Sequence, residues 1–416
     1  MKVRGGSKGR RSARQAPAAV MQQLSAYTAE EFREFLQGEV RALLMGCIQA
    51  EVDALCGPSY RPNPEAECHR AGSAPGYVLY EGRRQDIIRP RVRRKSGESE
   101  SEIQLATYAN AKEPGELRAR ILDAFSVGVS GRDQSRLHGE DTPGTSKSEV
   151  SRLWRREGAK RLAEFRERSI VREDWLVLML DGVWLDKELM AVVALGIAAD
   201  GTKHILDFEL GASESTETAK GLLERLVRRG FAPTKDGRLL VGLDGSSALK
   251  SAVLSYWPDA VIQRCLVHKE RNIRRFLRHK DWKELAGHFD RLRKAQGSVA
   301  GQEALKELER FVGERNQAAL ESLKEAGDEL LALHRLEVPA TLHVSLLSTN
   351  LIEGPFRNMR RKLERVSRWR AETEQASRWL AYGLLEAERG FRRLRHAGDL
   401  EALRRALQKS PEAVGA

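Results

Sequence analysis

The chain has 416 residues, of which 41% are hydrophobic and 31% are charged, a balance that predicts a soluble globular protein of two or three domains. No stretch approaches the roughly 20 apolar residues of a membrane span, and the charged N-terminus lacks the apolar core of a secretory signal, so we expect a cytoplasmic protein. The formal net charge is +12, and four cysteines are too few for a disulfide framework in a chain this long.

The positive charge is clustered. Residues 1–20 contain six basic residues and no acid, and residues 83–95, 264–280 and 355–370 each contain seven basic residues and one acid. A single cluster of this kind is usually a solvated helix face. Several clusters favour a nucleic-acid partner, because neutralised phosphates release their counterions.

The N-terminal part begins with a segment that lacks periodicity, residues 1–20, which we interpret as a disordered basic tail. Residues 28–56 then show helical spacing of apolar residues, with Thr28 and Glu31 as a capping box at the start. After Gly57, which stops this helix, a Pro/Gly/Arg-rich segment predicts a small β element with a basic edge.

Three short helices are predicted at 115–126, 130–138 and 147–157. The last helix presents small polar and basic groups on one face, as the recognition helix of a helix-turn-helix does, although any three-helix bundle shows the same pattern. We interpret residues 21–165 as a mostly helical DNA-binding region with a helix-turn-helix-like segment. Its predicted DNA contacts are Arg152, Arg155 and Arg156.

The next part of the chain changes to short apolar runs that predict strands. The predicted order is strands at 175–180, 189–198 and 204–210, a helix at 215–229, a strand at 238–243, a helix at 246–256 and a strand at 260–265. This order is that of the ribonuclease H-like fold, so we predict an α/β protein. Residues 268–338 are nearly all helical and charged and read as an all-α insertion, and residues 349–408 are helical and basic.

Two acids follow apolar runs in this region. Asp181 closes the first predicted strand and Asp244 closes the fourth, and a glycine follows each. These strands are neighbours in a sheet of this order, so the two carboxylates emerge at one edge, where they repel each other unless a divalent cation lies between them. Such a pair suits Mg²⁺, or Mn²⁺, in two-metal phosphoryl transfer. Gly182 and Gly245 are expected to leave room for a phosphate backbone.

Asp-Gly is also an ordinary turn sequence, and we interpret Asp200-Gly201 as a hairpin turn. Asp186 and Asp207 are rival acids, but they fall at a turn or in mid-strand. Asp181 and Asp244 both end buried apolar strands, so the functional interpretation is preferred for them.

The third acid is Glu353, in the segment 348–353. Glu353 and Asn350 lie one helical turn apart, and the alternative reading of the pair is a capping box. Pro355 disfavours helix in the residue before it, so the main helix is free to begin at Pro355 and leave Glu353 in the entry turn. Basic residues continue the same face and are predicted to grip DNA: Arg357, Arg360 and Arg361.

Cys265 and His268 have the spacing of half a zinc site, but two ligands cannot close a tetrahedron, and Cys68-His69 is the only other cluster. We therefore expect no zinc, and a packing or DNA-proximal role for His268. Arg264 and Arg271 beside it are predicted DNA contacts.

With these residues in view, the chain resembles bacterial insertion-sequence transposases of the Mutator family from about residue 25 to 385. The matching motifs are residues 180–184, 243–245, 263–272 and 348–353, of which the third is the most diagnostic. In one departure, residues 214–220 contain no tryptophan where the family often has one.

The resemblance implies a DDE transposase in which Asp181, Asp244 and Glu353 form the catalytic triad and bind Mg²⁺ or Mn²⁺. It implies that element ends are cut and rejoined with a 3′ hydroxyl as nucleophile. The implied partners are double-stranded DNA, both terminal inverted repeats and target, and further copies of the chain in a homodimer or larger synaptic assembly on the nucleoid.

The resulting layout has five parts. They are the tail 1–20, the DNA-binding region 21–165, a ribonuclease H-like catalytic core at 170–268 and 345–385, a helical insertion at 269–344, and a C-terminal basic helix and tail at 386–416. Two alternatives remain: a catalytically inactive transposon-derived protein that binds element ends, and a ribonuclease or resolvase on the same fold.

Overall fold

The computed structural model describes residues 28–408 except 81–82, 95–100, 113–114, 140–141, 365, 367 and 371. The predicted tail at 1–20 and the last residues of the predicted C-terminal segment lie outside this part. The chain divides into two compact units, Met1–Trp154 and Arg155–Ala416. None of the helices in the described part is long and apolar enough to cross a membrane.

The first unit starts with helix α2, Ala29–Cys56. Thr28 and Glu31 form the predicted capping box, and Gly57 ends the helix with a φ of 81°. The buried C-terminal part of α2 packs on an antiparallel sheet, as predicted for the β element. The sheet has the order β1-β2-β3, with strands Cys68–Tyr80, Arg83–Arg94 and Glu102–Ile103, and helix α3, Ala106–Lys112, follows it.

Three helices complete this unit and lead into the next: α4 (Gly115–Ser126), α5 (Gln134–His138) and α6 (Lys147–Glu167). They confirm the three predicted helices, although α5 begins at Gln134 rather than at 130 and α6 continues beyond the predicted end at 157. Val150 and Leu153 of α6 are buried against Ile121 of α4, and Trp154 meets Phe125 edge-on at 5.5 Å between ring centroids. The apolar side of the predicted recognition helix therefore faces a core, as expected.

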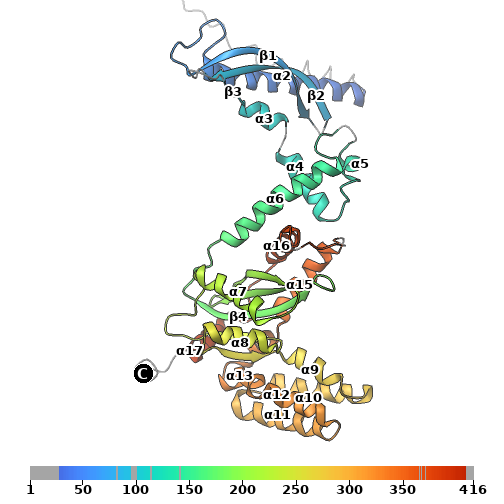
Figure 1. Cartoon of the computed structure of the whole chain (residues 1–416), viewed down its shortest axis with the longest axis vertical. Helices are drawn as coiled ribbons and strands as arrows, with labels where there is room; N and C mark the ends of the chain where they lie inside the picture. The colour runs from blue at the N-terminus through green and yellow to red at the C-terminus, as the bar shows by residue number, and fades with distance from the viewer. Residues whose placement is uncertain are drawn as a thin grey trace, which may run out of the picture. The chain divides into compact units, whose positions relative to one another are not determined.

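The second unit is built on a five-stranded sheet (Figure 1). Its order is β6-β5-β4-β7-β8, with β4 antiparallel to β5 and parallel to β7, and β7 parallel to β8. The strands and helices follow one another in the predicted order and make the chain a mixed α/β protein. They are β4 (Trp175–Trp184), β5 (Met190–Ala198), β6 (Lys203–Gly211), α7 (Thr216–Arg228), β7 (Leu240–Leu243), α8 (Ser247–Tyr256) and β8 (Val261–Arg264).

Helices cover both faces of this sheet because its strands are apolar on both sides. Leu178 and Leu180 of β4 face the buried residues of α7 and α8. Met179 and Val183 face the opposite core, to which α15 (Asn350–Leu363) and α16 (Gln375–Glu388) contribute. Because successive side chains of β4 point to opposite faces of the sheet, every second residue of this strand faces α15.

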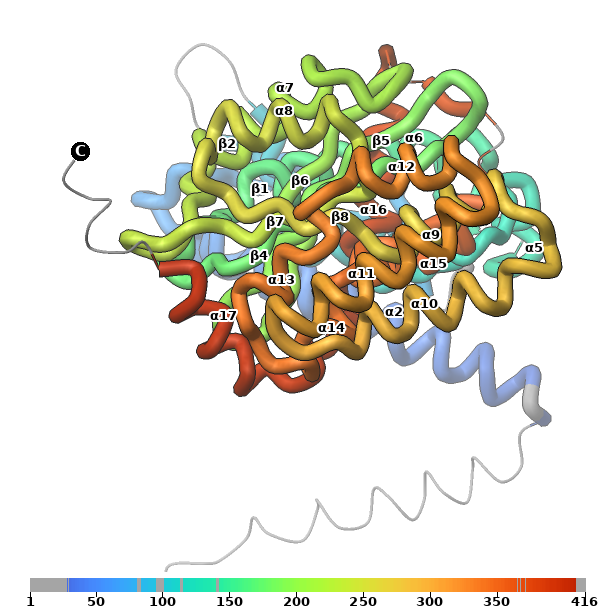
Figure 2. Tube along the Cα trace, turned by 90° about the horizontal axis from the view of Figure 1, so that it is seen from below, coloured from blue at the N-terminus to red at the C-terminus, as the bar shows by residue number. Residues whose placement is uncertain are grey.

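The chain between β8 and α15 is helical, as predicted. It contains α9 (Leu266–Arg274), α10 (Trp282–Lys294), α11 (Gly297–Gly313), α12 (Gln317–Ala326), α13 (Ala332–Arg335) and α14 (Ala340–Leu346), with short 3₁₀ turns. Within it α11 packs against both α10 and α12, as Figure 2 shows. Gln263 of β8 fastens this group to the sheet, because its side chain bonds to the backbone of Leu330 and Leu333. The last helix, α17 (Leu400–Ala406), follows α16.

Candidate active site

Asp181 and Asp244 lie at the same level of two parallel strands. Met179 of β4 pairs with Gly242 of β7, and each acid is two residues further along its strand. Asp181 is 5% exposed. It lies two residues after Met179 and therefore on the same face of the sheet, which α15 covers. The prediction that Asp181 closes its strand is wrong, because β4 continues to Trp184 in pairing with β5. Asp244 does follow the last residue of β7, as predicted.

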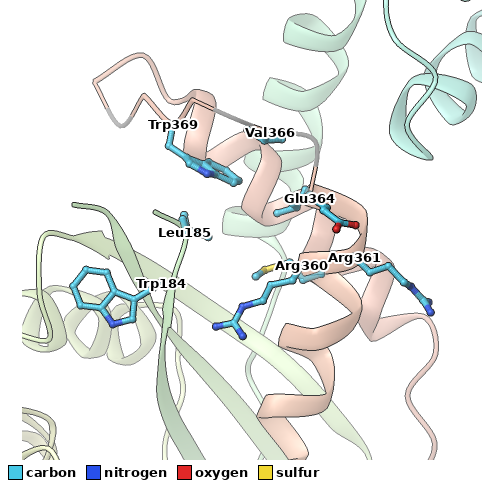
Figure 3. Close-up of a pocket in the computed structure, with 9 residues that line it drawn as sticks. Trp184, Leu185, Arg360, Arg361, Glu364, Val366 and Trp369 are labelled. Carbon is cyan, nitrogen blue, oxygen red and sulfur yellow. The ribbon is translucent and has the colours of Figure 1, made fainter. Parts of the chain in front are cut away.

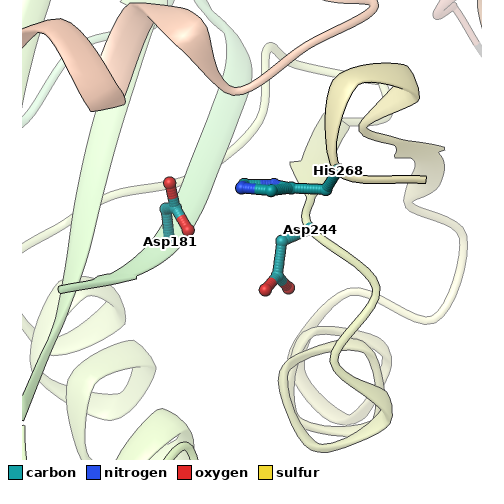
Figure 4. Close-up of side chains that lie close together, drawn as sticks. All are labelled: Asp181, Asp244 and His268. Atoms are coloured by element: carbon teal, nitrogen blue, oxygen red, sulfur yellow. The ribbon is translucent and has the colours of Figure 1, made fainter. Parts of the chain in front are cut away.

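His268 comes from the first turn of α9 and completes a cluster with the two acids. One ligand atom from each of Asp181, Asp244 and His268 lies within 4.8 Å of the others. Figure 4 shows the imidazole of His268 extending toward the Asp181 carboxylate, with the Asp244 carboxylate beside it. Within the described part of the chain, this is the one group of such side chains with metal-ligand spacing.

Glu353 reaches the same cluster from α15, where its Oε1 lies 3.2 Å from His268 Nε2. The contact has the distance of an ion pair but not the direction of a hydrogen bond, and this buried oxygen has no hydrogen-bond partner. The prediction that the helix begins at Pro355 is wrong. Helix α15 starts at Asn350, and Glu353 already donates its N–H to the carbonyl of Thr349. Pro355 removes only one N–H from the second turn.

Cys265 holds the start of α9 against the start of α15. Its sulfur accepts the N–H of His268 at 3.5 Å as the cap of α9, and the N–H of Thr349 at 3.4 Å. The Thr349 hydroxyl lies 3.4 Å from His268 Nδ1. Cys265 thus positions His268 and the start of the helix that carries Glu353.

The electrostatics of the cluster follow from burial of several carboxylates together. Burial, together with the neighbouring charges of Asp244 and Glu353, raises the pKa of Asp181 to about 8, although the charge of His268 opposes this rise. Hydrogen bonding to Cys265, together with the nearby carboxylates, raises the pKa of His268. Carboxylates that crowd in this way favour a bound cation, which removes their repulsion.

Glu214 is a fourth carboxylate at this edge of the sheet, and the sequence interpretation missed it. It directly precedes Ser215, the N-terminal cap of α7. Burial, and then the charge of Asp244, raise the pKa of Glu214. Two signals in the sequence pointed to it: its place at the start of the helix after the third strand, and the glycine at 182.

Neither glycine keeps space open for a phosphate, contrary to the prediction. A Cβ on Gly182 would overlap the Glu214 carboxylate and lie 2.6 Å from Cε of Met190, so protein atoms fill this space. Gly245 has a φ of 120°, and a Cβ there would lie 2.5 Å from Nη1 of Arg264. The backbone conformation and the Arg264 side chain therefore account for Gly245.

The rival acids have structural partners. Asp186 accepts the N–H groups of Glu188 and Leu189 in the β4–β5 turn. Asp200 accepts the N–H and hydroxyl of Thr202 in the predicted hairpin turn. Asp207 is fully buried in mid-strand between two arginines of the α7 region. The interpretation of all three as structural acids agrees with these contacts.

Most of the predicted DNA contacts are exposed arginines. They are Arg152, Arg155 and Arg156 on α6, Arg271 on α9, and Arg357, Arg360 and Arg361 on α15. Arg264 differs, because it is 6% exposed and its guanidinium is paired with Glu325 and Glu329. The structure therefore does not present Arg264 on a surface.

A cavity of about 430 Å³ lies where the end of β4 meets the C-terminal half of α15. Its lining includes Trp184, Leu185, Arg360 and Trp369. Figure 3 shows the Arg360 side chain extending toward the end of β4 at Trp184, whereas Arg361 points away from it. Trp184 is only three residues beyond Asp181, so cationic side chains of α15 border the strand that carries the buried acid.

Comparison with known proteins adds an independent line of evidence. Residues 12–392 match the family model described as transposase, Mutator family. The chain is 25% identical over 350 residues to the transposase for insertion sequence element IS905 of Lactococcus lactis subsp. lactis (strain IL1403), covering 81% of this chain and 85% of that protein. It is 29% identical over 272 residues to the transposase for IS6120 of Mycolicibacterium smegmatis, covering 63% and 80%. For the transposase of ISRM5 of Rhizobium meliloti (strain 1021), identity is 27% over 342 residues, covering 79% and 81%.

Proposed function

Because the chain belongs to the Mutator family of transposases, we propose that it catalyses metal-dependent cleavage and strand transfer of insertion-sequence ends. Asp181, Asp244 and Glu353 are its catalytic triad. The observation that carries this proposal is their convergence with His268 at one edge of the sheet, from elements far apart in the chain. Convergence of acids that repel one another is expected where a cation and a phosphate are to be held.

The residues fit a hard divalent cation, Mg²⁺ or Mn²⁺. The three acids offer carboxylate oxygens, which such ions prefer, and the buried Oε1 of Glu353 lacks a hydrogen-bond partner. When bound, the cation stabilises negative charge on the phosphate and lowers the pKa of the attacking hydroxyl. The protein holds its carboxylates on strands and on the first turn of a helix, so little rearrangement is needed to bind it.

We further propose that residues 170–268 and 345–385 form a ribonuclease H-like catalytic core interrupted by a helical insertion at 269–344. The sheet order β6-β5-β4-β7-β8 supports this, since three antiparallel strands are followed by two parallel ones. The insertion is joined to the core by charge pairs, including buried Arg264 with Glu325 and half-buried Lys250 with Glu329.

The proposed substrate is double-stranded DNA, as terminal inverted repeats and as target. Exposed arginines of α15 and α9 lie on the elements that carry Glu353 and His268, so DNA gripped by them reaches the acids. Residues 21–165 are proposed to bind the element ends through the helix-turn-helix-like segment that includes Arg152. A homodimer or larger assembly would bring two ends together for joining.

A strand-transfer assay tests the proposal. It uses the purified chain, Mg²⁺ and duplexes carrying the inverted repeats that flank its gene, with the variants Asp181→Asn, Asp244→Asn and Glu353→Gln. Each variant is expected to bind the ends as the wild type does and to lose cleavage and joining by at least about 10³-fold. Asp186→Asn is the matched control, because Asp186 is an acid in the adjacent turn with only backbone partners. It is expected to retain activity.

One outcome would favour the second candidate, a catalytically inactive protein that binds element ends. The wild type would then bind the ends tightly without cutting them at any concentration of Mg²⁺ or Mn²⁺. If the wild type cuts and joins but the three variants do so equally well, the triad is wrong.

A further inference from the structure

Glu214 stands out as a half-buried acid at the active-site edge that the catalytic triad does not explain. It is half-buried, and it lies across β4 from Asp181, because Gly182 and Asp181 face opposite sides of the strand. Its carboxylate fills the space of the missing side chain at Gly182. Burial and the charge of Asp244 raise the pKa of the carboxyl group, and hydrogen bonding from the Ser246 hydroxyl opposes them. Ser246 is two residues after Asp244, and it caps α8.

A structural role for this carboxylate is not apparent. A buried acid that stabilises a fold normally has a cationic partner, as Asp207 has in Arg225 and Arg229. Within the described residues, Glu214 takes part in no ion pair with lysine or arginine, and its electrostatic neighbours are Asp244 and His268. Placing it beside Asp244 costs repulsion that the fold alone does not offset.

The chain also keeps position 182 free of a side chain for Glu214. Even the methyl group of alanine would displace the carboxylate. The residue at 182 has extended strand conformation and no positive φ, so glycine is not needed there for its backbone. Its role is steric: it lets Glu214 approach the strand that bears Asp181.

We propose that Glu214 is a fourth carboxylate of the catalytic site, approaching it from the face of β4 opposite to Asp181 and helping to bind a divalent cation beside Asp244. This inference rests on the proposed metal-dependent function and adds a residue to it. Four carboxylates carry as much negative charge as two divalent cations carry positive charge, whereas the three carboxylates of the triad carry less.

The test measures metal binding as well as activity. Mn²⁺ binding to the purified full chain is followed by electron paramagnetic resonance for the wild type, Glu214→Gln, Glu214→Asp and Glu217→Gln. Glu217 is the matched control, because it is an exposed acid in the first turn of the same helix. Glu214→Gln is expected to weaken Mn²⁺ binding by about 10- to 100-fold and to raise the Mg²⁺ concentration needed for strand transfer. Glu214→Asp is expected to recover part of both, and Glu217→Gln to change neither.

Thermal unfolding separates this role from a structural one. In EDTA, Glu214→Gln is expected to melt at the same temperature as the wild type or higher, because its repulsion with Asp244 is removed. Addition of Mn²⁺ is expected to raise the melting temperature of the wild type more than that of the variant. A variant that is less stable in EDTA but binds Mn²⁺ normally overturns the proposal.

Asp181→Asn, measured in parallel, distinguishes this inference from the proposed function. If Asp181→Asn weakens Mn²⁺ binding and abolishes strand transfer while Glu214→Gln does neither, only the role of Glu214 is wrong. If Asp181→Asn leaves both unchanged, the metal-dependent function itself is wrong.

Discussion

Nε2 of His268 lies 3.2 Å from Oε1 of Glu353, although the two residues are separated by the whole group of helices α10 to α14. His268 is fixed by its place in the first turn of α9, next to the cap Cys265. It therefore orients the acid that arrives from α15, and the position of that acid depends on how the helical segment packs.

His268→Asn should lower strand transfer by about 10- to 100-fold, as is usual when a residue that orients a metal ligand is removed. Binding of the element ends should persist, because the exposed arginines of α15 are untouched. Cleavage and gel-shift assays on the same preparation measure the two effects. His396→Asn is the control, since His396 is exposed with a φ of 55° that asparagine accepts. Equal activity of the two variants would remove His268 from the site.

Gly182→Ala should reduce strand transfer because the added methyl group displaces the Glu214 carboxylate. We expect a loss of at least about tenfold, with a higher Mg²⁺ requirement, on the same physical grounds as for removal of a metal-orienting group. Gly242→Ala in neighbouring β7 is the matched control. There the nearest atom to an added Cβ is Cγ of Met179 at 3.4 Å, an ordinary contact. Normal activity and metal requirement of Gly182→Ala would show that the space at this position is not functional.

Asp207→Asn should destabilise the second unit by about 3–5 kcal/mol, because it leaves two arginines without their buried partner. Asp207 is fully buried, 3.0 Å from Nε of Arg225 and 3.3 Å from Nη1 of Arg229. Urea unfolding at neutral pH measures the loss. Asp200→Asn, in an exposed turn where the amide oxygen can still accept from Thr202, should cost less than about 1 kcal/mol. Similar unfolding midpoints for the two variants would contradict the structural reading of Asp207.

Arg264→Gln should lower stability rather than DNA affinity. The Arg264 guanidinium is buried and bonds to Glu325 and Glu329. Each acid keeps a lysine partner, so the loss of the charged hydrogen bonds of Arg264 is expected to cost about 1.5–3 kcal/mol. Arg271→Gln, on the exposed side of α9, should instead weaken DNA binding and reduce its salt dependence by about one phosphate contact. Gel shifts at several salt concentrations and urea unfolding compare the pair. A weaker salt dependence for Arg264→Gln would restore it as a DNA contact.

Stability should fall in acid because of two buried histidines, His334 and His343, whose ring centroids are 4.7 Å apart. Burial, and then the charge of His334, lower the pKa of His343 to about 4 from 6.5. Between these pH values the unfolded chain binds the proton more tightly than the folded chain. The stability is therefore complete above pH 6.5 and decreases below it, by up to about 1.4 kcal/mol per pH unit for each histidine.

Urea unfolding between pH 4 and 8 measures this slope. In the folded chain His343 Nδ1 donates to the carbonyl of Arg293 at 3.2 Å, and asparagine places an N–H donor at the same position. His343→Asn should therefore reduce the decline in the free energy of unfolding below pH 6.5. Its effect on the free energy of unfolding at pH 8 should be smaller than its effect in acid. A decline as steep as that of the wild type would assign the pH dependence to other groups.

Local sequence patterns were enough to predict the helices and strands and to place Asp181 and Asp244 together at one edge of the sheet. Apolar runs, capping residues and glycines act over a few neighbours in the chain, so strands β4 to β8, helix α2 and the positions of Asp181 and Asp244 at one sheet edge followed from local patterns. Tertiary structure decided which groups meet across long separations. The pairing of His268 with Glu353, the burial of Arg264 and the entry of Glu214 into the space at Gly182 depend on packing between distant segments. A residue type specifies charge and reach, but only the packed fold specifies its neighbours, and the neighbours decide whether an arginine contacts DNA or an acid belongs to the site.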